Sequence, residues 1–116
     1  MPAQRTTTKA MLASVALLLL AACATPKSDP TLYEELGSGA GIAAIVNGLL
    51  LELAEDERIR HHFTNLNIAG FRARLETHFC EITDGPCTFE GRSMQESHKL
   101  LGIKEADFNA LVEDLI

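Results

Sequence analysis

Apolar residues recur along this chain at the spacing of amphipathic helices. They fall three and four positions apart over residues 42–53, and the same spacing returns over residues 71–82 and 108–115. This period places the apolar side chains on one face of each helix, where they can pack against a neighbour. A shorter stretch over residues 31–36 fits a fourth helix. No segment alternates as a half-buried strand does, so the pattern predicts a single all-α domain.

The predicted connections between these helices are long and contain glycine. The stretch G-S-G-A-G at residues 37–41 is expected to be a flexible link, and residues 61–67 are expected to form a loop. Another short helix is predicted over residues 93–101, because Ser93 and Glu96 have the spacing of a capping box. Short helices with such connections indicate that something besides helix–helix packing fills the middle of the domain.

The N-terminal residues are typical of a secretory signal. Arg5 and Lys9 give a basic start, and residues 11–22 are apolar apart from one serine and too short to span a bilayer comfortably. The signal ends in L-A-A-C, which is similar to the bacterial lipobox. We therefore expect residues 1–22 to be a lipoprotein signal peptide and Cys23 to be lipidated. The alternative is an ordinary cleavage site followed by an incidental cysteine.

The lipobox resemblance also predicts where the protein resides. Residues 23–30 are polar and contain proline, so the lipidated cysteine and a short tether would precede a domain over residues 31–116. Ala24, rather than an aspartate, follows Cys23, and in lipoproteins this favours the outer membrane. The chain is thus expected to be exported and lipid-anchored at the periplasmic face of the bacterial outer membrane.

The charge balance narrows the range of partners. The sequence has 10 basic and 16 acidic residues, a net charge of −6. Removal of the signal peptide would take away two of the basic residues, leaving 8 basic against 16 acidic residues and a net charge of −8. This excess disfavours nucleic acid and anionic lipid headgroups as partners.

Cys80 and Cys87 stand seven residues apart, with the turn-forming residues 84–86 between them. A domain this small buries a limited core and benefits from a disulfide or a bound cofactor. Export would place both thiols in an oxidising compartment, where pairing is expected. The alternative is two unpaired, buried cysteines. The spacing does not fit a zinc site, because a second ligand pair is missing from the sequence.

The order of motifs resembles the group I truncated haemoglobins, and in particular their exported bacterial relatives with a lipobox. The resemblance runs from Thr31 to Ile116 and rests on LYEELGSGAGIAAIV, DERIRHHF, DGPC and EADFNALVEDL together. Its most specific part is residues 89–103, which read F-E-G-R-S-M-x-x-x-H-x-x-L-G-I.

The resemblance implies a shortened globin with helices packed two-on-two around haem b. His98 falls at the position of the proximal iron ligand, and the implied function is reversible binding of diatomic gases (O2, NO, CO), including oxygen transport. The haem-lining positions of the family correspond to Phe63, Phe71, Arg74, Leu75, Phe79, Phe89, Met94, Ile103 and Phe108. From composition alone, most of these would be ordinary core residues.

The distal side departs from the O2-binding members of the family. Where those proteins usually carry a tyrosine, this chain has Leu50, and the facing positions are Phe71 and Leu75. Without a hydrogen-bond donor, bound O2 should leave and autoxidise faster, while CO and NO should be less affected. Arg74 is expected to contact a haem propionate, with a solvated arginine as the alternative.

The other histidines are weaker candidates for the site. His61 and His62 are expected at the surface. His78 lies on the apolar face of the helix over residues 71–82 and is expected at the haem edge, with a sixth iron ligand as the alternative.

The resemblance also implies a longer final helix and one more helix beyond it. This chain reaches Leu115 and Ile116 without them, so we expect the last helix to be missing and haem retention to be weakened. One alternative is therefore a lipoprotein that has lost its haem. Another is NO detoxification or peroxidase activity on the haem, which would need an unidentified reductase because no flavin or nicotinamide motif is present. We expect a gas-binding protein rather than an enzyme.

Overall fold

The computed structural model describes residues 28–116. Within them the chain forms α2 (Leu32–Glu35), α3 (Ser38–Glu55), the 3-10 helix η2 (Arg60–Phe63), α4 (Ile68–Ile82), α5 (Met94–His98) and α6 (Glu105–Leu115). The expected signal peptide, residues 1–22, and Cys23 lie outside the described residues, as does most of the tether over residues 23–30.

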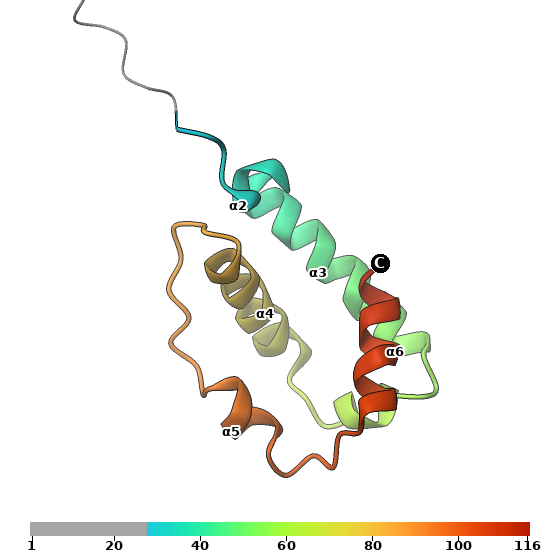
Figure 1. The fold of residues 1–116 in the computed structure, drawn as a ribbon. Coiled ribbons are helices and arrows are strands. Elements are labelled where there is room, and N and C mark those ends of the chain that lie inside the picture. Colours follow the sequence, from blue (N-terminus) through green and yellow to red (C-terminus); the bar gives the residue numbers. More distant parts are fainter. Residues whose placement is uncertain (1–27) are drawn as a thin grey trace, which may run out of the picture.

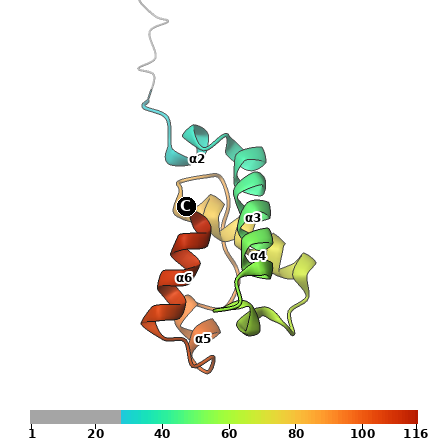
Figure 2. The same cartoon turned by 90° about the vertical axis from the view of Figure 1, so that its right-hand side faces the viewer.

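The all-α prediction is confirmed, since residues 28–116 contain helices and connections and no strand. The three long helices fall where the apolar spacing predicts them. The central helix is α3, which packs against both α4 and α6, and α2 packs on its N-terminal end. The two perpendicular views show α2 at one end of the molecule and α5 at the other (Figures 1 and 2).

The hydrophobic core lies along one face of α3. Ile42, Val46, Leu49 and Leu53 are buried there, and Ile59 from the following turn and Ala110 from α6 join them. Partly buried side chains from η2, α4 and α6 pack around this centre, among them Phe63, Leu75, Phe79 and Leu111. By length and composition α3 could also cross a membrane, but its apolar stripe is the core of this domain.

The glycine-rich stretch at residues 37–41 is a corner and not the flexible link that was predicted. Gly37 turns the chain with φ of +94°, and α3 begins at the next residue. The corner is so tight that a Cβ on Gly41 would lie 1.7 Å from the carbonyl oxygen of Leu36. Only glycine fits there, so the glycines allow α2 to fold back on α3. The predicted loop over residues 61–67 likewise begins with η2.

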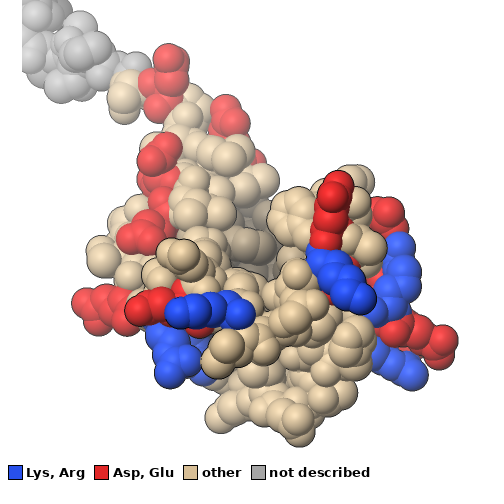
Figure 3. Space-filling model, turned by 60° about the horizontal axis from the view of Figure 1, so that its bottom comes forward, with Lys and Arg blue, Asp and Glu red and all other residues tan. Residues whose placement is uncertain are grey.

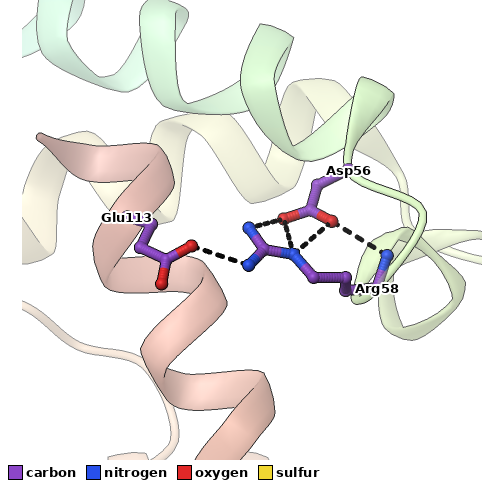
Figure 4. Close-up of polar contacts among 3 residues, drawn as sticks. All are labelled: Asp56, Arg58 and Glu113. Atoms are coloured by element: carbon purple, nitrogen blue, oxygen red, sulfur yellow. Dashed lines mark hydrogen bonds and ion pairs between the residues drawn. The ribbon is translucent and has the colours of Figure 1, made fainter.

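A charged contact ties the turn after α3 to α6. Arg58 Nη2 lies 2.6 Å from Asp56 Oδ2, and Arg58 Nη1 lies 2.6 Å from Glu113 Oε2 (Figure 4). Hydrogen bonding from Arg58 lowers the pKa of Asp56. Because the Arg58 side chain is 56% exposed, solvent screens these ion pairs, and their main effect is to fix the register of α6 on the turn.

Candidate functional site

The short helix α5 begins with the predicted capping box. Ser93 Oγ accepts a hydrogen bond from the Glu96 backbone N–H at 3.1 Å, and Glu96 Oε2 accepts one from the Ser93 N–H at 3.3 Å. The helix ends at His98, however, and not at residue 101 as predicted. The chain turns after His98 and reaches Gly102 in the left-handed conformation, with φ of +64°. His98 thus stands in the last turn of a five-residue helix.

The His98 imidazole is held by its own helix. Its Nδ1 lies 2.6 Å from the carbonyl oxygen of Met94, one turn earlier. In the neutral tautomer with hydrogen on Nδ1, this nitrogen donates to the carbonyl and the Nε2 lone pair stays free. The side chain is exposed, so Nε2 is accessible from outside the helix. A neutral imidazole with one nitrogen anchored and the other free is the form that binds a metal.

Apolar side chains stand exposed near His98 in the sequence. Met94, Ile103 and Phe108 are 42%, 41% and 59% exposed, although the resemblance places all three against haem. Figure 3 shows a broad area without charged groups at this end of the molecule, with charged side chains gathered on both sides of it. Exposed apolar side chains, together with an imidazole that has one free nitrogen, suit an apolar, metal-bearing group.

The aromatic side of the candidate site comes from η2 and α4. Phe71, Leu75 and Phe79 are four residues apart, so they share one face of α4, and all three are half-buried. The Phe63 and Phe71 rings lie 5.8 Å apart, centroid to centroid. Arg74 is exposed and has no ion-pair partner within residues 28–116.

Phe71 and Leu50 meet at a small cavity between α3, η2 and α4. Its volume is about 230 Å³, and its apolar lining comprises Leu50, Leu53, Ala54, Phe63, Ile68 and Phe71. The predicted apolar pocket therefore unites Leu50 with Phe71, whereas Leu75 packs on the core. Arg60 and Thr64 complete the lining, which the sequence reasoning missed. The Thr64 hydroxyl donates to the His61 carbonyl at 3.2 Å.

His78 in α4 and Phe89 in the segment after it make a second aromatic contact at the candidate site. The two rings meet edge to face with centroids 5.3 Å apart. His78 is half-buried, and its Nδ1 is buried without a hydrogen-bond partner within the described chain. Phe89, which follows α4, therefore packs back on that helix.

The two remaining histidines differ in their surroundings. His61 is exposed, as predicted. The side chain of His62 is only 13% exposed, so the prediction of a surface residue is wrong for this one. Its Nε2 lies 3.4 Å from Asp107 Oδ2, close enough to interact electrostatically but not aligned for a hydrogen bond. This contact joins η2 to the first turn of α6.

Cys80 and Cys87 are joined by a disulfide, with Cα atoms 5.8 Å apart. The bond closes the turn between α4 and the segment that leads to α5. No group of three or more histidine, cysteine, aspartate or glutamate side chains within residues 28–116 could hold a metal ion.

Comparisons with known proteins identify the fold. A model of the bacterial-like globin family matches residues 31–115. The group 1 truncated haemoglobin GlbN of Synechocystis is 32% identical over 90 residues, covering 74% of this chain and 73% of the relative. The group 1 truncated haemoglobin of Tetrahymena thermophila is 29% identical over 89 residues, covering 77% and 74%.

Solved structures agree with these matches. The Fe(III) form of truncated haemoglobin from Tetrahymena pyriformis superposes with a TM-score of 0.71 at 28% identity, covering 74% of each chain. The 2/2 haemoglobin from a Synechococcus, in the cyanomet state with covalently attached haem, gives a TM-score of 0.70 at 28% identity, covering 74% and 73%. The chain belongs to the bacterial-like globins, and among them to the truncated 2/2 haemoglobins of group 1.

The contact between His62 and Asp107 predicts a pH dependence of stability. The pKa of Asp107 is lowered, first by a hydrogen bond from the Lys104 backbone N–H at 2.9 Å and then by His62. A lowered pKa means that the carboxylate stabilises the fold above its ordinary pKa of 3.8 and loses this effect as pH falls through the lower folded value. Asp107→Asn should therefore lower the melting temperature at pH 7, and this effect should shrink as pH falls below 3.8.

Circular dichroism melts between pH 3 and 7 measure this effect. Glu105→Gln, in the same first turn of α6, is the matched control and should change the melting temperature little at any pH. A destabilisation by Asp107→Asn that is equal at pH 3 and pH 7 contradicts the assignment.

Proposed function

We propose that this globin binds haem b through His98 and reversibly binds diatomic gases at the haem iron. The observation that carries the proposal is the His98 side chain, whose Nδ1 is engaged by the Met94 carbonyl while Nε2 stays free. The exposed apolar residues Met94, Ile103 and Phe108 support it, because a haem would remove them from water. The Synechococcus relative with covalently attached haem supports it as well.

The chain offers residues for each part of the haem. The aromatic and aliphatic side chains proposed to flank the porphyrin are Phe63, Phe71, Leu75, Phe79, Phe89, Met94, Ile103 and Phe108. Arg74 is exposed and free of ion pairs in the described part of the chain, so its guanidinium is available to a propionate. A haem held by these residues would supply the iron atom that binds a gas ligand.

The distal pocket sets the proposed order of gas preference. Leu50 and Phe71 bring no hydrogen-bond donor to the cavity, and the Thr64 hydroxyl already donates to the His61 carbonyl. Arg60, which also lines the cavity, is half exposed, and its Nη2 lies 3.6 Å from Glu57 Oε1 at the surface. Bound O2 carries partial negative charge and gains from a donor, whereas CO depends on one less. We therefore infer that the protein holds O2 weakly relative to CO and NO.

Replacement of His98 tests the proposed iron ligand. After reconstitution with haem, the wild-type protein should show a Soret band in the ferric and ferrous states, and His98→Ala should lose it or shift it strongly. His61→Ala, which removes an exposed histidine from η2, is the control and should leave the spectrum unchanged. Recovery of the wild-type spectrum when imidazole is added to His98→Gly would separate loss of the ligand from misfolding. An unaltered spectrum in His98→Ala refutes the assignment.

A donor placed in the cavity tests the proposed gas preference. Leu50→Tyr should slow O2 dissociation from the ferrous protein by about tenfold or more, since a hydrogen bond to a charged acceptor contributes about 1.5–3 kcal/mol. Leu50→Phe, which adds the ring without the hydroxyl, is the control. Stopped-flow kinetics with O2 and CO measure the effect. Equal rates of O2 dissociation from the two variants would rule out the lack of a donor as the cause of weak O2 binding.

We also propose that the protein is a lipoprotein, anchored at Cys23 to the periplasmic face of the outer membrane. The L-A-A-C sequence before Ala24 supports this location. Cells fed a labelled fatty acid should incorporate the label into the wild-type protein and not into Cys23→Ser, and only the wild type should fractionate with the outer membrane. Recovery of the wild-type chain as an unlabelled soluble protein would overturn the proposed anchor.

A further inference from the structure

The segment that carries His98 is attached to the rest of the domain at very few points. Over residues 88–103, a single hydrogen bond within the described chain reaches another part of it, from the Phe89 N–H to Glu81 Oε1 at 3.1 Å. The remaining hydrogen bonds of this segment are local to α5 and its turns. Every residue from Glu90 to Ala106 is exposed. The position of α5 therefore depends on how the two ends of the segment are held.

At the far end, the segment reaches α6. There Asp107 contacts His62 and accepts a hydrogen bond from the Lys104 N–H, while Glu113 pairs with Arg58. These contacts fix α6 on η2 and on the turn before it. The far end is thus held by a helix that packs on α3.

At the near end, the segment leaves a turn that the disulfide closes. Cys80 in α4 is 3% exposed and is bonded to Cys87, and the Gly85 N–H donates to the Cys80 carbonyl at 2.8 Å. A Cβ on Gly85 would lie 2.7 Å from both Cys80 Sγ and the Tyr33 ring, so the turn is packed directly on the bridge and on α2. Two residues after Cys87, the Phe89 ring rests against His78.

We propose that the Cys80–Cys87 bridge is a positioning element for His98, so that haem retention depends on the thiol–disulfide state of this turn. The proposal rests on the proposed role of His98 as iron ligand. With the bridge intact, Phe89 is held against α4 and the path of the chain toward α5 is fixed. With the bridge open, the near end is held by the hydrogen bond of Gly85 and by the contacts of Phe89 without a covalent link, and α5 gains freedom relative to α4.

The bridge can be opened by a dithiol reductant in two steps. A thiolate of the reductant attacks Cys87 Sγ, the more exposed sulfur, because Cys87 is half-buried and Cys80 is buried. The bond between the sulfurs breaks, a mixed disulfide forms, and the Cys80 thiolate takes up a proton. The second thiol of the reductant then displaces Cys87, which leaves as a thiol. Two electrons and two protons pass to the protein, and the dithiol becomes a disulfide.

Haem loss is the first measurement. The holoprotein, with and without dithiothreitol, and the double variant Cys80→Ser/Cys87→Ser are mixed with excess apomyoglobin, and haem transfer is followed in the Soret region. We expect haem loss to become about tenfold faster once the bridge is absent, as is typical when support of a metal ligand is removed. The double variant is also the control for the reductant, which should not change its rate.

Resonance Raman spectra of the ferrous protein give a readout that a purely structural role would not move. We expect the iron–histidine stretching band to shift or broaden when the bridge is opened, because the orientation of His98 is then less fixed. An unchanged band together with an unchanged rate of haem loss overturns the proposal.

Trypsin gives a readout that does not depend on haem. Arg92 and Lys99 lie in the segment, and cleavage after both should accelerate without the bridge, while cleavage after Arg74 in α4 should not. Acceleration at all three sites reports general unfolding and overturns a positioning role, as does faster cleavage with unchanged haem loss. A wild-type protein without a Soret band refutes the proposed function instead, and the cleavage pattern still decides whether the bridge positions α5.

Discussion

Burial of the apolar stripe of α3 is the interaction on which the rest of the domain depends. Ile42, Val46, Leu49 and Leu53 form the centre against which α4 and α6 pack. In α4, Phe79 packs on this core and Phe71 lines the cavity beside Leu50 and Leu53 of α3. In α6, Phe108 is left exposed when the helix packs on α3. The packing of α3 therefore determines where the aromatic residues of the candidate site stand, and one of its four buried residues, Leu53, also lines the cavity beside Phe71.

The segment that carries His98, residues 88–103, is held in a different way. It is fixed by covalent and polar contacts at its ends, since residues 90–106 are exposed and add nothing to the buried core. Such a segment has little free energy of its own with which to resist opening. Binding of a haem would bury Met94, Ile103 and Phe108, and His98 would hold its iron. By linkage, a bound haem would stabilise the fold, and the free energy of unfolding would rise with the logarithm of its affinity.

The features that could be predicted from the sequence are those determined by neighbouring residues, and the features that could not are determined by contacts between distant ones. The spacing of apolar residues predicts α3, α4 and α6, and Ser93 with Glu96 predicts the start of α5, because periodicity and capping act within one helix. The corner at Gly41 was missed, since it comes from the close approach of the Leu36 carbonyl, which no local pattern reveals. The enclosure of His62 was missed for the same reason, because Asp107 lies far along the chain. The site residues themselves followed from the order of family motifs rather than from composition.

The acidic character of the chain is not evenly distributed, and this bears on how the domain holds together. Residues 28–57 contain acidic side chains and no basic one, whereas Arg58 begins the part of the chain that carries the described lysines and arginines. The turn after α3 therefore contains the first basic residue of the described chain. Arg58 there contacts Asp56 and Glu113, and burial together with nearby Asp56 raises the pKa of Asp114 beside them. A partly buried carboxyl with a raised pKa weakens the fold when it ionises, so the arginine offsets repulsion that α6 would otherwise meet on approaching this turn. At the far end of the His98 segment, the ion pairs of Arg58 help to hold α6 in place. At the near end, the Cys80–Cys87 disulfide holds the chain.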